Sequence, residues 1–196
     1  SRTCAVRRSD FFQSSAAARK AAAVVGNHRS TAPDGLNAAD HVAYVQGYED
    51  GTVRPGAPVT RAETAAMLYR LLTDARRAEI RSTTHRFTDV SAANWYQEAV
   101  ASMARGGYLT GYADGSFGGD RSITRAEFVA MLTRFLGQQS ATCSFSDVDR
   151  SHWAYDAIAA ATASGWITGY ADGSFRPDQS ITRAEAMAIL NRVLNR

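Results

Sequence analysis

The chain has little lysine and no long hydrophobic run. Lys20 is its only lysine, and every other basic side chain is an arginine. No stretch approaches the roughly 18 apolar residues of a membrane-spanning helix, so we expect no membrane insertion. The least polar stretch, 16–25, contains Arg19 and Lys20 and is too rich in small residues for a signal-peptide core. Any export signal is therefore expected to lie outside this sequence.

The chain is also poor in cysteine, with only Cys4 and Cys143. It contains no Cys-x-x-Cys pair and no Cys/His cluster, which argues against a zinc site. In an extracellular setting the two thiols could form a disulfide, but two free thiols fit the sequence equally well.

Other sites with recognisable signatures are missing too. Asp114 begins a segment similar to a calcium loop, but its twelfth residue is Arg125, where such a loop needs glutamate. The segment from Asp172 fails in the same way. The four histidines lie in unrelated contexts, without a Ser/His/Asp or Cys/His frame or a phosphate-binding glycine motif. We therefore expect no catalytic residue, no metal, no cofactor and no enzyme activity.

The net charge of +3 is only mildly basic. Without an arginine stripe or a nucleic-acid motif, DNA and RNA are not expected partners. A few arginines would instead suit an anionic ligand, because guanidinium pairs with carboxylate in a two-pronged geometry.

What the chain does have is a segment that occurs three times, at residues 47–63, 111–127 and 169–185. The third copy reads GYADGSFRPDQSITRAE. Such self-similarity identifies an array of repeated units. Asp-Gly predicts a turn in the middle of each copy, and Thr-x-x-Glu at its end is the pattern of a helix capping box.

The residues around each copy predict a helix–loop–helix unit. After each capping box, apolar residues recur at the spacing of one face of a three-turn helix. Upstream, we expect helices at about 94–105 and 152–164. Their predicted buried stripes are Trp95, Ala99 and Met103 in one helix and Trp153, Ala157 and Ala161 in the other.

The predicted fold class is therefore all-α, with three helical units packed against one another because one helix pair cannot bury its own apolar face. We expect an alanine-rich helix at 14–25, one or two helical turns at 37–44, and polar linkers at 73–86 and 137–144.

Together, Phe-x-Asp-Val, the tryptophan that follows it, Gly-Tyr-x-Asp-Gly and Thr-Arg-Ala-Glu closely resemble the S-layer homology (SLH) family over roughly residues 43–196. The resemblance implies three repeats in a pseudo-threefold bundle. We assign an N-terminal arm to 1–30 and the repeats to 31–72, 87–137 and 145–196.

The resemblance also implies a function. The family anchors exported proteins to the bacterial cell wall by binding a secondary cell-wall polysaccharide, often pyruvylated and therefore anionic, in grooves between repeats. The expected location is the cell surface, and the expected state is a monomer. The implied ligand-binding residues are Arg61, Arg125, Arg183, Asp89, Asp147, Trp95, Trp153, Gly47, Gly111 and Gly169.

The first repeat departs from the family pattern. The positions that correspond to Phe87, Asp89 and Trp95 are occupied by Ala23, Val25 and Thr31. The groove that would use this half is expected to be altered, which leaves two working sites at most. An alternative function is a protein-interaction or surface-assembly module that uses the same grooves.

Each implied site residue also has a structural explanation. The motif arginines could bind an anion beside exposed helix N-terminal amides, or they could be solvated surface residues. The tryptophans could stack on sugars or belong to the core. The aspartates could bind sugar hydroxyls or hold turns. The later arginines at 70, 134 and 192 are interpreted as structural, since cations favour helix C-termini.

Overall fold

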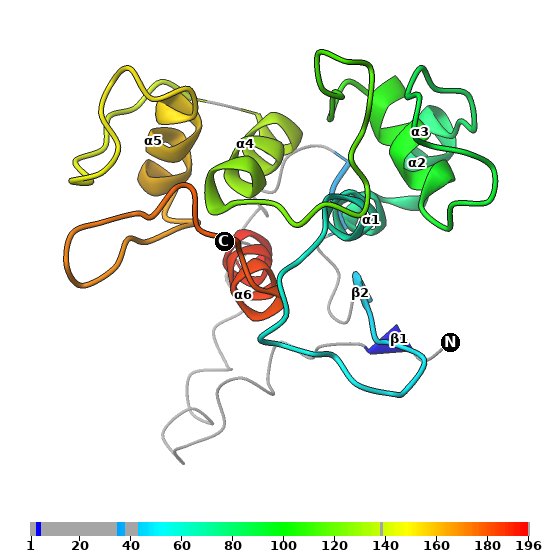
Figure 1. Cartoon of the computed structure of the whole chain (residues 1–196), viewed down its shortest axis with the longest axis horizontal. Helices are drawn as coiled ribbons and strands as arrows, with labels where there is room; N and C mark the ends of the chain where they lie inside the picture. The colour runs from blue at the N-terminus through cyan, green and yellow to red at the C-terminus, as the bar shows by residue number, and fades with distance from the viewer. Residues whose placement is uncertain (1–2, 5–34, 38–42, 138, 196) are drawn as a thin grey trace, which may run out of the picture.

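The computed structural model describes residues 3–4, 35–37, 43–137 and 139–195, and within them it is mainly helical, as predicted (Figure 1). None of the helices in these ranges is long and apolar enough to cross a membrane. Two short antiparallel strands pair, β1 (Thr3–Cys4) and β2 (Val45–Gln46). The helices are α1 (Arg61–Leu71), α2 (Asp74–Ile80), α3 (Gln97–Arg105), α4 (Arg125–Leu136), α5 (Tyr155–Ala163) and α6 (Arg183–Leu194).

Capping boxes begin α1, α4 and α6, and this prediction is confirmed in all three repeats. In each, the threonine hydroxyl accepts the N–H of the glutamate three residues later, and the glutamate carboxylate accepts the threonine N–H. The pairs are Thr60/Glu63, Thr124/Glu127 and Thr182/Glu185. The conserved geometry fixes the same helix start in each repeat.

A closed ring of backbone hydrogen bonds joins the three repeats just before these helices. The Val59 N–H donates to the Ile181 carbonyl (3.0 Å), Ile181 donates to Ile123 (3.1 Å), and Ile123 donates back to Val59 (3.1 Å). All three side chains are fully buried. The ring gives the bundle its pseudo-threefold axis, and α1, α4 and α6 surround the centre of Figure 1.

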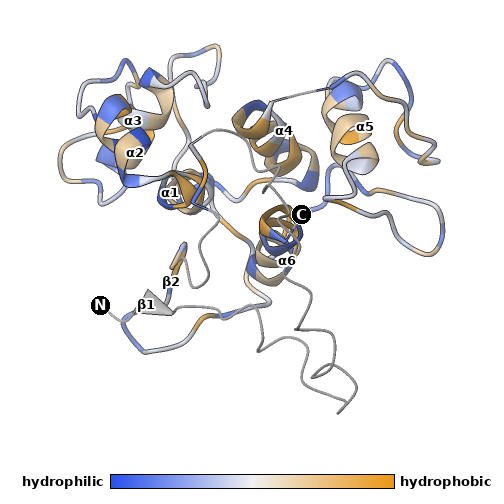
Figure 2. Ribbon diagram, turned by 180° about the vertical axis from the view of Figure 1, so that it is seen from behind, coloured by the Kyte–Doolittle hydropathy of each residue, from blue (hydrophilic) through white to orange (hydrophobic). Residues whose placement is uncertain are grey.

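The core lies between the capped helices and the helices that pack outside them. Helix α3 packs on α1, and α5 packs on α4. In Figure 2 the hydrophobic colour is concentrated on helices such as α4 and α6. The apolar residues predicted to face the core after the capping boxes are buried, except that Leu194 is half-buried. The others are Met67, Leu68, Leu71, Leu72, Phe128, Met131, Leu132, Phe135, Leu136, Ala186, Ile189, Leu190 and Val193.

The predicted buried stripes of the outer helices are wrong at their first residue, and Ala99 in the second position is only half-buried. Trp95 and Trp153 are 63% and 64% exposed and lie in turns before α3 and α5. The next residue along the chain, Tyr96 or Ala154, is buried instead. The stripes therefore run one residue later than predicted at this end, through Tyr96, Val100 and Met103 and through Ala154, Ile158 and Ala161.

The predicted linker at 73–86 is also partly wrong, because it contains helix α2. The hydroxyl of Thr73 caps this helix by accepting the Arg76 N–H at 3.2 Å. Ile80 at its end is buried and holds the helix against α3. The linker at 137–144 contains no helix among its described residues.

The front of repeat 1 is described only in part. The helix predicted at 14–25 lies outside the described residues, and in the 37–44 segment residues 43–44 are not helical. The buried Tyr44 hydroxyl donates to Asn191 Oδ1 on α6 at 2.8 Å, so this segment packs on the third repeat. Burial raises the pKa of Tyr44 to about 12. Cys143 carries a free thiol.

Candidate functional site

The repeats meet at three related places, each built around the tyrosine of a Gly-Tyr motif, the glutamate of the same repeat and the motif arginine of another repeat. Site 1 contains Tyr48, Glu63 and Arg183. Site 2 contains Tyr112, Glu127 and Arg61. Site 3 contains Tyr170, Glu185 and Arg125. Each site therefore joins two repeats around the pseudo-threefold axis.

The three motif arginines are not solvated surface residues. Arg61, Arg125 and Arg183 are only 8%, 6% and 2% exposed. Each guanidinium lies 4.8–4.9 Å from the centre of its tyrosine ring, within cation–π range. Each also donates to a loop carbonyl of the neighbouring repeat, namely that of Thr110 (2.7 Å), Phe175 (2.9 Å) or Val53 (2.8 Å). The arginines thus hold the repeats together.

The helix N-terminal amides beside these arginines are occupied. The N–H groups of Arg61 and Ala62 donate to the carbonyls of Arg121 and Gly119, both at 2.9 Å. The first two amides of α4 and α6 make the equivalent bonds to the next repeat. The prediction of exposed amides at an anion site is therefore wrong, and any anion binding must come from the side chains.

Ion pairing differs among the three sites. Arg183 pairs with Glu63 at 2.5 Å in site 1, and Arg125 pairs with Glu185 at 3.2 Å in site 3. In site 2, Glu127 pairs with Arg121 at 3.0 Å. No carboxylate of the described residues forms an ion pair with Arg61.

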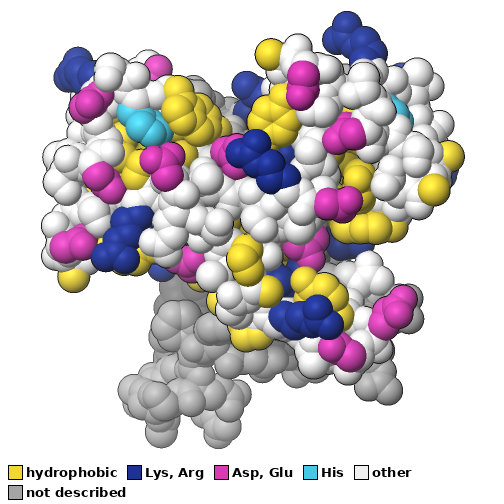
Figure 3. All heavy atoms as spheres, in the orientation of Figure 1, with side chains coloured by type: hydrophobic (Ala, Val, Ile, Leu, Met, Phe, Trp, Pro, Cys, Tyr) yellow, Lys and Arg dark blue, Asp and Glu magenta, His cyan; other side chains and the backbone are white. Residues whose placement is uncertain are grey.

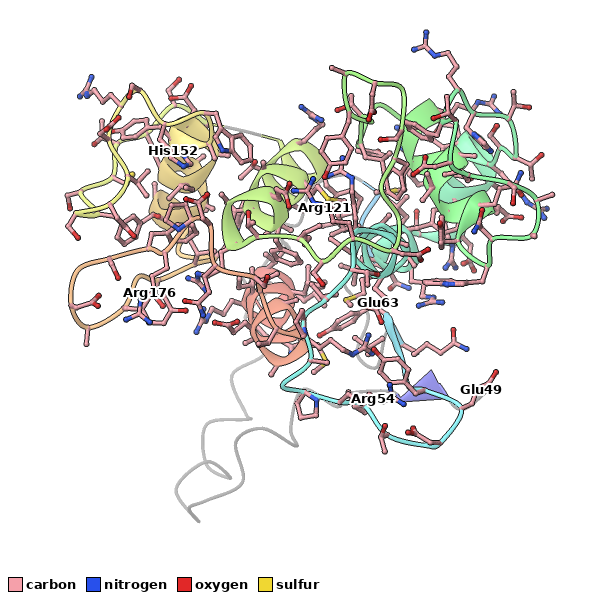
Figure 4. All side chains as sticks on the ribbon, viewed as in Figure 1. Glu49, Arg54, Glu63, Arg121, His152 and Arg176 are labelled. Carbon is pink, nitrogen blue, oxygen red and sulfur yellow. The ribbon has the colours of Figure 1, made fainter. Side chains whose placement is uncertain are left out.

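A cavity of about 670 Å³ opens at site 1, and three repeats contribute to it. Repeat 1 supplies Gly47, Tyr48 and Arg54, repeat 3 supplies Arg183, and repeat 2 supplies Trp95. Figure 4 shows Arg54 and Glu49 on the loop that follows β2, with Glu63 closer to the centre of the molecule. In the same region of Figure 3, a basic side chain lies against hydrophobic ones between acidic neighbours. Charged groups and an exposed aromatic face therefore line one hollow.

A smaller cavity of about 170 Å³ lies at site 3. It is lined by Gly169, Tyr170, Glu185, Arg192 and the motif Arg125 of repeat 2. No tryptophan lines it. In site 1 the tryptophan comes from the following repeat. For site 3 the corresponding position in the sequence is residue 31, where the chain has threonine.

Asp89 and Asp147 hold the loops of their own repeats. The two carboxylate oxygens of Asp89 accept the N–H groups of Phe117 (2.6 Å) and Gly118 (2.7 Å), and Asp147 accepts those of Phe175 (2.8 Å) and Arg176 (2.7 Å). Partial burial acts to raise the pKa of each carboxyl, but the amide bonds outweigh it, and the pKa lies below its ordinary value. Such geometry is that of a loop-bracing carboxylate.

This pKa direction predicts a pH-dependent effect of Asp147→Asn. A carboxyl whose pKa is lowered on folding contributes stability above its unfolded pKa of about 4, and the contribution disappears as pH falls through the folded pKa. The variant should therefore be less stable than wild type at pH 7 and approach it below pH 3. Urea unfolding at several pH values measures this. A stability difference that stays constant with pH would contradict the role given to the carboxylate.

The two motif glycines whose surroundings are fully described are required by packing. A Cβ atom on Gly111 would lie 2.5 Å from the Ser116 carbonyl oxygen and 2.7 Å from the Phe87 ring. On Gly169 it would lie 2.4 Å from the Phe145 ring. These glycines let the phenylalanine of Phe-x-Asp-Val pack under the loop, and Gly47 and Gly169 also line the cavities.

The sequence reasoning missed a second arginine at each tyrosine. Arg54 lies 4.0 Å from the Tyr48 ring centre, and Arg176 lies 3.9 Å from that of Tyr170. Both have left-handed backbones, with φ of 49° and 58°, where repeat 2 has a glycine. The recurrence of Arg-Pro in copies one and three was the available signal. In repeat 2, Arg121 takes the place on the tyrosine, at 5.1 Å.

Comparison with known proteins places these sites in a family context. The model of the S-layer homology domain matches residues 37–65, 86–129 and 144–187, which is more than half of the chain. The first match is shorter and begins only at residue 37, in agreement with an incomplete first repeat.

Relatives include proteins of Acetivibrio thermocellus. The chain is 35% identical to "Cell surface glycoprotein 1" over 80% of its own length and 7% of the relative's. It is 34% identical to a "Cellulosome-anchoring protein" over 84% of its length and 38% of that protein. It is also 33% identical to an endoglucanase of a Bacillus species over 64% of its length and 13% of the enzyme.

The chain therefore spans well under half of the length of these relatives, and enzymes among them are matched only over a small part. Some other relatives are named as surface-layer proteins. Three matched segments, the repeated motif arginines and the shared loop geometry agree with one another. The chain belongs to the S-layer homology domain family.

Proposed function

We propose that this chain is a non-catalytic anchoring module of the bacterial cell surface, which binds an anionic, pyruvylated secondary cell-wall polysaccharide in the grooves between repeats. The observation that carries the proposal is site 1, where the exposed Trp95 and the buried Arg183 line one cavity with Tyr48. Family membership and the names of the surface-anchored relatives support the same function.

The chemistry of site 1 suits a charged sugar. The face of an exposed tryptophan can cover the apolar face of a pyranose ring. Guanidinium has five N–H groups, and Arg183 donates three bonds, to Val53, Glu63 and Gln46, so two N–H groups remain for a ligand oxygen. Arg70 and Arg54, the latter paired with Asp50, also line this cavity beside acidic side chains, and they offer guanidinium groups to a carboxylate-bearing polymer.

The pattern of tryptophans indicates which sites are complete. Trp95 of repeat 2 serves site 1, and by the same succession Trp153 of repeat 3 belongs to site 2. Site 3 would need a tryptophan at position 31, where the chain has threonine. We therefore propose two working sites, with Asp89 and Asp147 acting through the loops that they brace.

Trp95→Ala tests the proposal without disturbing the core, because this side chain is mostly exposed. Its one ring contact among the described residues is with the adjacent, buried Tyr96. We expect it to weaken binding to purified wall sacculi at least ten-fold, while Trp95→Phe keeps part of the affinity because it retains an aromatic face. Co-sedimentation over a range of sacculus concentrations measures both.

The matched control is Arg81→Ala, which removes a well-exposed side chain that is absent from the cavity lining at site 1. It should bind sacculi as wild type does. Wild-type protein that fails to sediment with sacculi, or a Trp95→Ala variant with full affinity, would contradict the proposal. A wall anchor of this kind should also elute as a monomer in gel filtration, whereas self-association would favour the assembly-module alternative.

A further inference from the structure

Site 2 differs from the other two sites in how its glutamate and its motif arginine are paired. Its glutamate, Glu127, keeps the same bonds as its counterparts, since it accepts the Thr124 N–H (3.0 Å) and the Tyr112 hydroxyl (3.3 Å). Its arginine partner is different. Glu127 pairs with Arg121 of its own repeat instead of Arg61, the motif arginine from repeat 1. The carboxylate of Glu127 thus keeps its bonds within the repeat and pairs with a different guanidinium.

The sequence explains why this happens in repeat 2 alone. The position of Arg121 is occupied by Ala57 in repeat 1 and by Gln179 in repeat 3. Repeat 2 also has Gly118 where the other repeats have Arg54 and Arg176. These two arginines pair with aspartates of their own loops, and neither forms an ion pair with a motif glutamate among the described residues. Arg121 is thus a replacement that reaches the glutamate.

The exchange leaves Arg61 as a buried cation without a carboxylate partner among the described residues. Its Nη2 donates to the Thr110 carbonyl at 2.7 Å, and its Nε is buried with no hydrogen-bond partner in the part of the chain that the structure describes. Arg125 and Arg183 both use Nε to reach a loop carbonyl. Burial lowers the pKa of Arg61. A buried, incompletely bonded charge is costly in the absence of a counter-ion, and an anion would supply the missing one.

The surroundings of Arg61 favour an anion further. Its guanidinium lies over the rings of Tyr112 (4.8 Å) and Phe117 (5.1 Å), which leave its edge as the place for an acceptor. The exposed Arg134 donates to the Thr110 hydroxyl at 2.9 Å, and Arg61 donates to the carbonyl of the same residue, so a second cation lies nearby. Figure 4 shows Arg121 on the loop that leads into α4.

We propose that site 2 is the preferred carboxylate-binding site of the three, and that Arg121 is the positioning residue that makes it so by holding Glu127 away from Arg61. In sites 1 and 3 the protein's own glutamate occupies the motif arginine, and a ligand carboxylate must compete with it. In site 2 no carboxylate of the described residues forms an ion pair with the motif arginine, and Glu127 acts on Arg61 only from beyond ion-pair distance. The inference deepens the anchoring function proposed above and rests on it for the identity of the natural ligand.

The test uses sodium lactate as a small carboxylate probe and follows the Nε–H NMR resonances of the three motif arginines. We expect the Arg61 resonance to shift at a lactate concentration at least ten-fold below that needed for Arg125 or Arg183. Arg121→Gln, which introduces the residue of repeat 3, should raise the half-saturating concentration for Arg61 at least ten-fold, because Glu127 then pairs with Arg61.

A double variant distinguishes a positioning role of Arg121 from direct contact between Arg121 and the anion. In Arg121→Gln/Glu127→Gln the competing carboxylate is gone, and glutamine can still complete the capping box, so the Arg61 response should return. Arg176→Gln is the matched control, since this arginine lies on the tyrosine of site 3 but pairs with Asp172, and it should leave the Arg61 response unchanged.

Three results would overturn the inference: equal responses of all three arginines to lactate, an Arg61 response that survives Arg121→Gln, or a loss that the double variant fails to restore. The last result would mean that Arg121 touches the anion itself. The lactate titration does not depend on wall binding. A protein that shows this pattern but does not bind sacculi would refute wall anchoring, while the inference about the carboxylate site would still hold.

Discussion

Replacing Arg183 with alanine is expected to lower the free energy of unfolding by about 3–5 kcal/mol, because it leaves a mostly buried carboxylate without its cation. Arg183 pairs with Glu63 at 2.5 Å and also donates to the carbonyls of Val53 and Gln46 in repeat 1. The substitution therefore cuts side-chain bonds that close repeat 3 onto repeat 1. Urea unfolding followed by circular dichroism measures the loss.

Arg81→Ala is the control for this prediction, since Arg81 forms an exposed pair with Glu98 at 3.1 Å. Exposed pairs contribute about 0–1 kcal/mol, so the control should change stability little. Equal, small effects in both variants would show that Arg183 does not join the repeats. The expected loss also means that reduced wall binding by a motif-arginine variant could reflect unfolding, which makes Trp95 the better probe of binding.

Replacing Phe175 with alanine is expected to cost about 3–5 kcal/mol, the usual range for a phenylalanine deleted from a core. Phe175 is fully buried, packs against Phe145 with ring centres 5.4 Å apart, and carries the guanidinium of Arg125 at 4.8 Å. Its N–H is one of the two that Asp147 accepts. The side chain therefore connects the loop, the Phe-x-Asp-Val motif and the interface between repeats.

The matched variant is Val53→Ala, at the corresponding position of repeat 1. Val53 is only half-buried. From about 0.8 kcal/mol per fully buried methylene, its loss should cost about 1 kcal/mol. A thermal or urea unfolding series compares the two variants. If Phe175→Ala were no more damaging than Val53→Ala, the loop of repeat 3 would not depend on the packing described here.

The helices after the capping boxes could be predicted from sequence because short-range patterns determine them. Thr-x-x-Glu fixes the start, and the apolar spacing fixes the face that is buried. Trp95 and Trp153 were predicted at the start of buried stripes because periodicity alone does not show that a turn precedes the helix. Helix α2 was missed because its seven residues contain only one buried side chain, Ile80, and give little periodic signal.

The sequence identified many residues of the candidate site, but it did not predict the contacts between them. The repeats and the resemblance identified the arginines, but contacts between residues 120 or more positions apart, such as Arg183 with Glu63, cannot be read from a pattern. The same holds for the occupied helix N-terminal amides, whose acceptors are loop carbonyls of another repeat. The different pairing at site 2 depends on Arg121, a single residue outside every motif.

The most direct test of wall anchoring is co-sedimentation of the wild-type chain with bacterial wall sacculi before and after mild acid removes their pyruvate ketals. If the grooves bind an anionic, pyruvylated polysaccharide, most of the protein should sediment with untreated sacculi and remain in solution with treated ones. A charge-assisted bond of about 1.5–3 kcal/mol at each site corresponds to a roughly ten-fold to hundred-fold loss. Sedimentation that is the same with both preparations would contradict recognition of a ketal carboxylate, and no sedimentation with either would contradict wall anchoring.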